Sequence, residues 1–170
     1  TVTYGTVDNI PGESPKCWIT RNLGAEQQAV TVDDTSEAAA GWYWQFNRAQ
    51  GYSHDGDVRI PADWITSVDE NSDWQVANDP CALELGSGWR IPTSTEWYNV
   101  QNVYGNCFDW SKPGYAEFKI HAAGFISYHD GSLYHRGEFG NYWSSSQSSN
   151  NMSNNAYCSQ NAQFKMNGCS

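Results

Sequence analysis

The residues best suited to bind a ligand lie close together near the C-terminal end of the sequence. Between positions 148 and 167, which we call the polar stretch, amides, hydroxyls and one phenol follow one another at short spacing. Antibodies use Tyr, Ser, Gly and Asn for adaptable contacts, and Tyr gives a large contact area at low entropic cost. We therefore predict a ligand-binding surface formed by Asn150, Asn151, Asn154, Asn155, Tyr157, Gln160, Asn161 and Gln163. We expect the loop from His129 to His135 to assist this surface. The alternative is a polar edge strand and loop without a ligand.

A second group of oxygen-bearing side chains has the alternating spacing found in the first half of an EF-hand loop. It consists of Asp69, Asn71 and Asp73. However, Trp74 stands where that loop needs a glycine, and Pro80 stands where it needs a bidentate Glu. The pattern therefore excludes an EF-hand and leaves a looser calcium site or a solvated acidic loop. We expect no other cofactor.

No combination of residues indicates catalysis. The four histidines, at positions 54, 121, 129 and 135, are far apart in the sequence. None accompanies a nucleophilic serine in an elbow motif, and no two have the spacing of a metal-binding pair. The sequence therefore predicts a protein that is not an enzyme.

Charge and hydropathy exclude two classes of partner. Nine basic residues stand against nineteen acidic ones, which gives a net charge of −10. Phosphate backbones would repel such a chain, because its few Lys and Arg residues are not clustered. No run of 18 apolar residues is present, so we expect neither nucleic-acid binding nor membrane insertion.

The five cysteines indicate an oxidising compartment. They lie at positions 17, 81, 107, 158 and 169, and none forms the C-x-x-C pair typical of zinc or redox sites. Together with abundant Asn, Ser, Gly and Trp, they predict two disulfides and one thiol left over. We expect the protein to be extracellular, on a cell surface or on a virion surface.

Length and composition favour one α+β domain over residues 1–170. Aromatic residues make up 15% of the 170 residues, including nine Trp, so they must supply much of the core. Long segments rich in Gly, Asp and Asn indicate ordered loops between two short helices and a small antiparallel sheet. The tryptophans expected to be buried are Trp18, Trp44, Trp89, Trp97 and Trp143.

Local patterns place the main elements. The clearest helix runs from near Thr93 to near Gly105, because Thr93 and Glu96 form a capping box. We also expect Arg90 to bind a carboxylate such as that of Glu96. A second helix is expected near Thr35 and Ser36. Strands are predicted within residues 1–10, 17–24, 42–46, 118–128 and 132–146, with core positions at 42, 44 and 46 and a bend at position 124.

Three segments together resemble a known family. They are CWITRNLG, then NDPC followed by GSGWRIPTSTEW, and finally HAAGF with DGSLYHRGEFGNYWSSSQSS. In these segments the chain is similar to the Fibrobacter succinogenes major paralogous domain family of secreted and surface proteins. That resemblance implies the C-type-lectin-like fold, which phage tropism determinants and proteins diversified by retroelements also use.

The resemblance leads to specific expectations. Family members continue into a final strand that carries a further cysteine, so the final C-terminal strand is expected to be missing here. The start at Thr1, without Met or a leader, suggests a mature or excised fragment. The calcium-dependent sugar-binding motifs of lectins are absent.

These observations predict an extracellular ligand-recognition module that binds a cell-surface glycan or a protein. It would act as an adhesin or a phage receptor-binding domain, as part of a larger multi-domain protein or phage-tail assembly. The first alternative is a non-binding structural module of a larger surface protein. A formylglycine-generating type of enzyme is the second alternative, and it lacks support because no segment resembles the reactive cysteine site of those enzymes.

Overall fold

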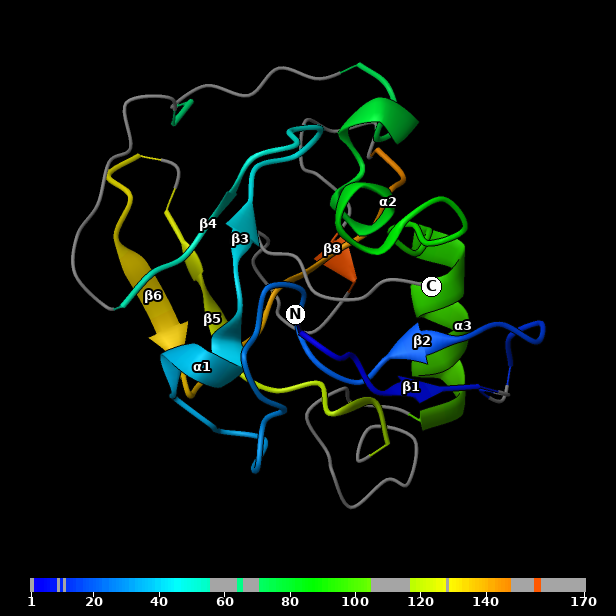
Figure 1. Ribbon diagram of the computed structural model, residues 1–170, viewed down its shortest axis with the longest axis horizontal. Coiled ribbons are helices and arrows are strands. Elements are labelled where there is room, and N and C mark those ends of the chain that lie inside the picture. Colours follow the sequence, from blue (N-terminus) through cyan, green and yellow to red (C-terminus); the bar gives the residue numbers. More distant parts are fainter. Residues whose placement is uncertain are drawn as a thin grey trace.

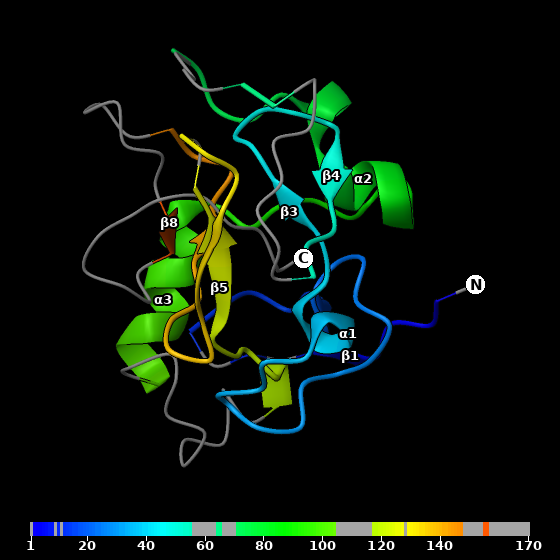
Figure 2. The same ribbon diagram turned by 90° about the vertical axis from the view of Figure 1, so that its left-hand side faces the viewer.

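The protein is a mixed α+β structure with few short helices and small two-stranded antiparallel sheets (Figure 1). The computed structural model describes residues 2–8, 10, 12–55, 64–65, 71–104, 117–127, 129–147 and 155–156. In Figure 1 the hairpins β3–β4 and β5–β6 lie to one side, and the longest helix, α3, lies to the other with β1 and β2. In the turned view of Figure 2, α3 lies on the left and α2 on the right, whereas both lie on the right in Figure 1.

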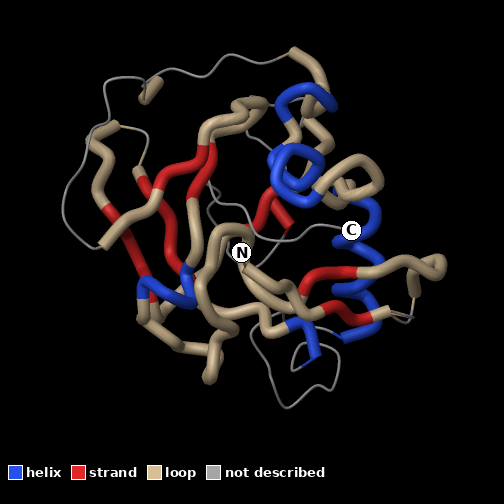
Figure 3. The backbone as a smooth tube through the Cα atoms, in the orientation of Figure 1, coloured by secondary structure: helices blue, strands red, loops and turns tan. Residues whose placement is uncertain are grey.

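The helices and strands are short, and loops connect them (Figure 3). In chain order they are β1 (Thr6–Val7), β2 (Trp18–Ile19), α1 (Glu37–Ala40), β3 (Tyr43–Trp44), β4 (Gly51–Tyr52), the 3-10 helix η1 (Val76–Asn78), α2 (Pro80–Leu85), α3 (Ser94–Tyr104), β5 (Ala123–Ile126), β6 (Leu133–Arg136), β7 (Tyr142–Trp143) and β8 (Asn155–Ala156).

The eight strands of the described residues form four separate pairs of consecutive strands. The pairs are β1 with β2, β3 with β4, β5 with β6 and β7 with β8, and all four are antiparallel. The predicted α+β class is therefore confirmed, although the sheets are smaller than expected. At the position of the predicted bend, Gly124 lies within β5 with a φ of +73°, which departs from the extended backbone of a strand.

Helix α3 begins as the sequence predicted. The backbone N–H of Glu96 donates to Oγ1 of Thr93 at 3.2 Å, and the backbone N–H of Thr93 donates to the Glu96 carboxylate at 2.7 Å. These reciprocal bonds are the capping box. Arg90 donates two hydrogen bonds to the same carboxylate, at 2.8 and 2.5 Å, and Lys16 donates a third. Glu96 therefore joins the helix to the two loops that carry Arg90 and Lys16. The contact between Arg90 and the Glu96 carboxylate was expected from the sequence.

Helix α2 was not predicted, although the residues that indicate it lie close together in the sequence. The Asp79 carboxylate accepts from the backbone N–H of Cys81 at 2.9 Å and also from that of Ile91 at 3.0 Å. Pro80 occupies the first turn, where its missing N–H costs nothing, and Gly86 follows the last turn. The expectation of only two helices was therefore wrong, because an Asp cap, a Pro and a Gly at these positions predict a helix of their own.

Aromatic side chains dominate the core, as predicted. Four of the five tryptophans expected inside are buried, namely Trp18, Trp44, Trp97 and Trp143. The polar ends of Trp97 and Trp143 are used as well, since the indole N–H of Trp143 donates to the carbonyl of Trp44 at 3.0 Å and that of Trp97 donates to the carbonyl of Trp143 at 2.9 Å. Trp89, which was expected to be mostly buried, packs against this core and is partly buried.

Two of the five cysteines lie in the described residues. Cys81 is fully buried and disulfide-bonded, whereas Cys17 is an exposed free thiol. The presence of one free cysteine and one disulfide-bonded cysteine agrees with the odd number of cysteines in the sequence. Within the same residues, no helix has the length and apolar character needed to cross a membrane.

Candidate functional site

Most of the predicted ligand-binding residues lie outside the described residues. This applies to Asn150, Asn151, Asn154, Tyr157, Gln160, Asn161 and Gln163. Asn155 is described only as part of β8, where its backbone pairs with that of Trp143. Trp143 is buried and donates its indole N–H to the core, so β8 pairs with a strand that is anchored in the core.

One of the three candidate calcium ligands, Asp73, takes part in a loop contact. Asp69 lies outside the described residues, and both Asn71 and Asp73 are exposed. The Asp73 carboxylate accepts a hydrogen bond from the backbone N–H of Gln147 at 2.7 Å, which ties this loop to the segment after β7. Within the described part of the chain, no group of three or more His, Cys, Asp or Glu side chains is arranged to hold a metal ion.

A cluster of four rings, three of them exposed, lies at the β5–β6 hairpin. It consists of Phe125, Tyr134, His135 and Phe139, which we call the ring surface. The Phe125 and Tyr134 rings stack with centroids 5.7 Å apart and planes 20° apart, and His135 meets Phe139 edge to face at 5.0 Å. Tyr134 is 42% exposed and Phe139 is 44% exposed, although both belong to this packed cluster. Exposed apolar rings in contact with one another are typical of interaction sites.

The backbone holds the ring surface in place. Gly124 and His135 face each other across the hairpin, with φ angles of +73° and +57°. A Cβ atom on Gly124 would lie 2.4 Å from the carbonyl oxygen of Tyr134, so only glycine fits there. The backbone N–H of Gly124 also donates to the carbonyl of Phe139 at 2.7 Å. A non-glycine residue at positive φ carries a backbone cost that the surrounding contacts must offset.

Tyr43 fixes both strands of the hairpin to the core. Its hydroxyl donates to the carbonyl of Ala123 in β5 at 2.9 Å and accepts from the guanidinium of Arg136 in β6 at 2.7 Å. Arg136 also donates to the carbonyl of His54 at 2.6 Å. Burial raises the pKa of Tyr43 to about 12, so this hydroxyl stays protonated and keeps its donor at physiological pH.

The ring surface was only partly foreseen. The loop from His129 to His135 was expected to assist the polar stretch, but Phe125 and Phe139 were not identified as site residues. In Figure 1, β6 lies at one edge of the molecule, whereas β8 lies towards α3, so the two predicted parts are not adjacent where they are described. An alternating strand pattern shows that two faces exist but not which one is covered.

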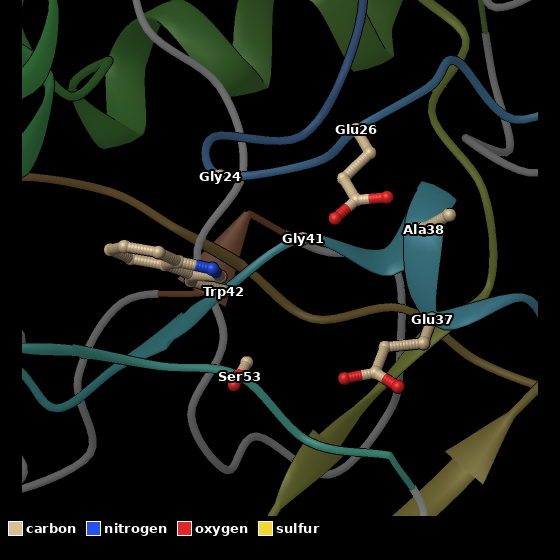
Figure 4. A pocket seen from close by; sticks show the side chains of 7 residues that line it. All are labelled: Gly24, Glu26, Glu37, Ala38, Gly41, Trp42 and Ser53. Carbon is tan, nitrogen blue, oxygen red and sulfur yellow. The ribbon is translucent and has the colours of Figure 1, made fainter. Parts of the chain in front are cut away.

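A pocket of about 380 Å³ opens beside Trp42 (Figure 4). Its wall comes from the loop after Leu23, the first residues of α1, the residues just before β3 and the residue just after β4. The lining residues are Gly24, Glu26, Glu37, Ala38, Gly41, Trp42 and Ser53. Figure 4 shows the carboxylates of Glu26 and Glu37 on one side of the pocket and Trp42 on the other.

Two glycines hold the Trp42 indole. A Cβ on Gly24 would lie 2.6 Å from Cγ of Trp42, and one on Gly51 would lie 2.9 Å from its Cε3. The backbone N–H of Trp42 donates to the carbonyl of Leu23 at 3.0 Å. The ring is thus confined while 39% of the residue remains exposed. Of the predicted core positions 42, 44 and 46, position 42 was therefore wrong, because its side chain lines a pocket instead.

No known protein family, no curated protein and no solved structure matches this chain. The family resemblance of the sequence motifs therefore stays a prediction.

Proposed function

We propose that this protein is an extracellular ligand-recognition module with a C-type-lectin-like fold. It binds a partner on a cell surface and performs no catalytic step. The observation that carries the proposal is the ring surface, in which exposed aromatic side chains are held on a hairpin anchored to the core. The sequence motifs support the fold, and the disulfide-bonded Cys81 supports an oxidising location.

Rigid support is what makes these rings suitable for binding. A side chain that must be ordered on binding costs about 0.5–1.5 kcal/mol of affinity. Tyr134 and Phe139 avoid much of this cost, because ring contacts and the backbone bond from Gly124 to Phe139 already position them. Rigid aromatic rings are also over-represented among the residues that dominate binding energies.

The polar stretch is the second part of the proposed binding surface. Within this stretch, the backbone of Asn155 and Ala156 pairs with β7. Antibody loops also combine adaptable amides with rigid aromatic anchors, and here the two kinds of contact would come from different segments of the chain. The proposal assigns ligand contacts to Asn154, Asn155 and Tyr157 within this stretch.

Binding of the intact, fluorescently labelled chain to whole cells and to isolated cell envelopes tests the proposal. We expect saturable binding that excess unlabelled protein displaces. Replacing Asn154, Asn155 and Tyr157 together by Ala should weaken it at least tenfold with little change in melting temperature. Absence of saturable binding, together with self-association through the ring surface, would instead support a structural module.

A further inference from the structure

The pocket beside Trp42 contains polar groups that have no partner among the described residues. Neither the Glu26 nor the Glu37 carboxylate is hydrogen-bonded or ion-paired to any of these residues, although they line the same cavity. The indole N–H of Trp42 is likewise unpaired within this part of the chain. In Figure 4 the nitrogen-bearing end of the indole is turned towards the side where both carboxylates lie.

We propose that this pocket binds a neutral carbohydrate. An indole N–H can only donate a hydrogen bond, and an ionised carboxylate can only accept one. A ligand that satisfies both must accept from Trp42 and donate to Glu26 and Glu37. A sugar hydroxyl does both at one oxygen, and neighbouring hydroxyls on one ring can reach both sides of the pocket. Ser53 adds a hydroxyl that can donate or accept.

Charge and hydrogen-bond type exclude the two charged alternatives. An anionic ligand, such as a sulfated or carboxylated sugar, would meet two carboxylates and no cationic side chain in the lining. An ammonium group would suit the carboxylates but offers no acceptor to the indole N–H. A neutral polyhydroxyl ligand is the class that uses every polar group of the pocket.

The pocket also has a suitable size and a fixed shape. Its volume of about 380 Å³ lies within the range of about 300–1,000 Å³ that is typical of small-molecule sites. Gly24 and Gly51 confine the indole, so the donor is oriented before a ligand arrives. The site therefore suits a terminal sugar unit. This inference rests on the proposed recognition function and selects a glycan over a protein as the ligand of this pocket.

Nuclear magnetic resonance of the ¹⁵N-labelled chain tests the inference, because each Trp indole N–H gives its own signal. The Trp42 signal is assigned from the Trp42→Phe variant, which keeps a ring but removes the donor. The probes are neutral oligosaccharides such as lactose and mannotriose, the anionic sialyllactose, and a lysine-containing peptide. We expect a neutral oligosaccharide to shift the Trp42 signal in a saturable way.

Three variants examine the roles of individual groups. Glu26→Ala and Trp42→Phe should each weaken oligosaccharide binding about tenfold, since each removes a hydrogen bond to the sugar. Glu117→Ala, which removes an exposed carboxylate outside the pocket, should leave binding unchanged. Both pocket variants should keep the dispersed spectrum of a folded protein.

Several results would overturn the inference. It fails if none of the neutral oligosaccharides shifts the Trp42 signal at tens of millimolar, or if sialyllactose or the lysine peptide binds instead. It also fails if Glu26→Ala binds as tightly as the wild-type chain. If any of these results is obtained while the wild-type chain still binds cells, only the sugar pocket is rejected. If the wild-type chain does not bind cells, the proposed recognition function is rejected.

Discussion

Glu96 shows how one side chain can join distant segments. Burial alone would raise its pKa, but hydrogen bonds from Arg90 and Lys16 outweigh that effect and lower the pKa from its usual 4.5 to about 2. A carboxylate with a lowered pKa stabilises the folded state at pH values above its usual pKa. That stability is lost as the pH falls towards the pKa of the folded protein.

We therefore expect the free energy of unfolding to decrease as the pH falls from about 4.5 to about 2. The Glu96→Gln variant should be less stable at pH 7 and should show a weaker decrease across this interval. Urea unfolding at a series of pH values measures both effects. If the free energy of unfolding decreases equally with pH in both proteins, Glu96 is not the cause of the decrease.

Two tryptophans that look alike in the sequence differ in burial. Trp143 is 1% exposed and donates its indole N–H to the core, whereas Trp89 is only partly buried. We expect Trp143→Ala to lower the free energy of unfolding by about 3–5 kcal/mol. Trp89→Ala should cost about 1–2 kcal/mol, because less surface returns to water. Equal costs in denaturant titrations would contradict the burial described here.

At the scale of elements, local signals were sufficient where the partners are close in sequence. Thr93 and Glu96 predicted the start of α3 because both halves of a capping box lie within four residues. The same reasoning applied to Asp79, Pro80 and Gly86 would have predicted α2. In contrast, the exposure of Trp42 depends on contacts with Gly24 and Gly51, which come from other segments. No local pattern contains that information, so the pocket could not be predicted.

The β5–β6 hairpin depends on one glycine in a way that can be measured. Gly124 and Gly86 both have positive φ angles, but a Cβ would clash with the backbone only at Gly124. Gly124→Ala should therefore be the more destabilising change, by about 1–3 kcal/mol relative to Gly86→Ala. Thermal unfolding of the two variants gives the comparison. If Gly124→Ala is less destabilising than Gly86→Ala, the hairpin can accommodate a Cβ atom at position 124 without cost.

For the whole molecule, composition correctly predicted an aromatic core in an α+β domain. Buried rings with bonded polar ends stabilise a structure whose strands are only two to four residues long. The predicted binding residues were mostly polar, because antibody-like composition was the signal available in the sequence. The exposed rings and the pocket depend on how loops cover the core, and this cannot be inferred from composition.

The ring surface is the central element of the proposed function, and one binding measurement tests it most directly. The double variant Tyr134→Ser and Phe139→Ser is compared with a control, Val30→Ser and Val76→Ser, whose valines are 77% and 82% exposed and belong to no ring cluster. In the whole-cell assay, we predict that the first variant binds at least tenfold more weakly, with a melting temperature within about 4 °C of the wild type. The control should bind like the wild type. Unchanged binding of the ring variant would contradict the account.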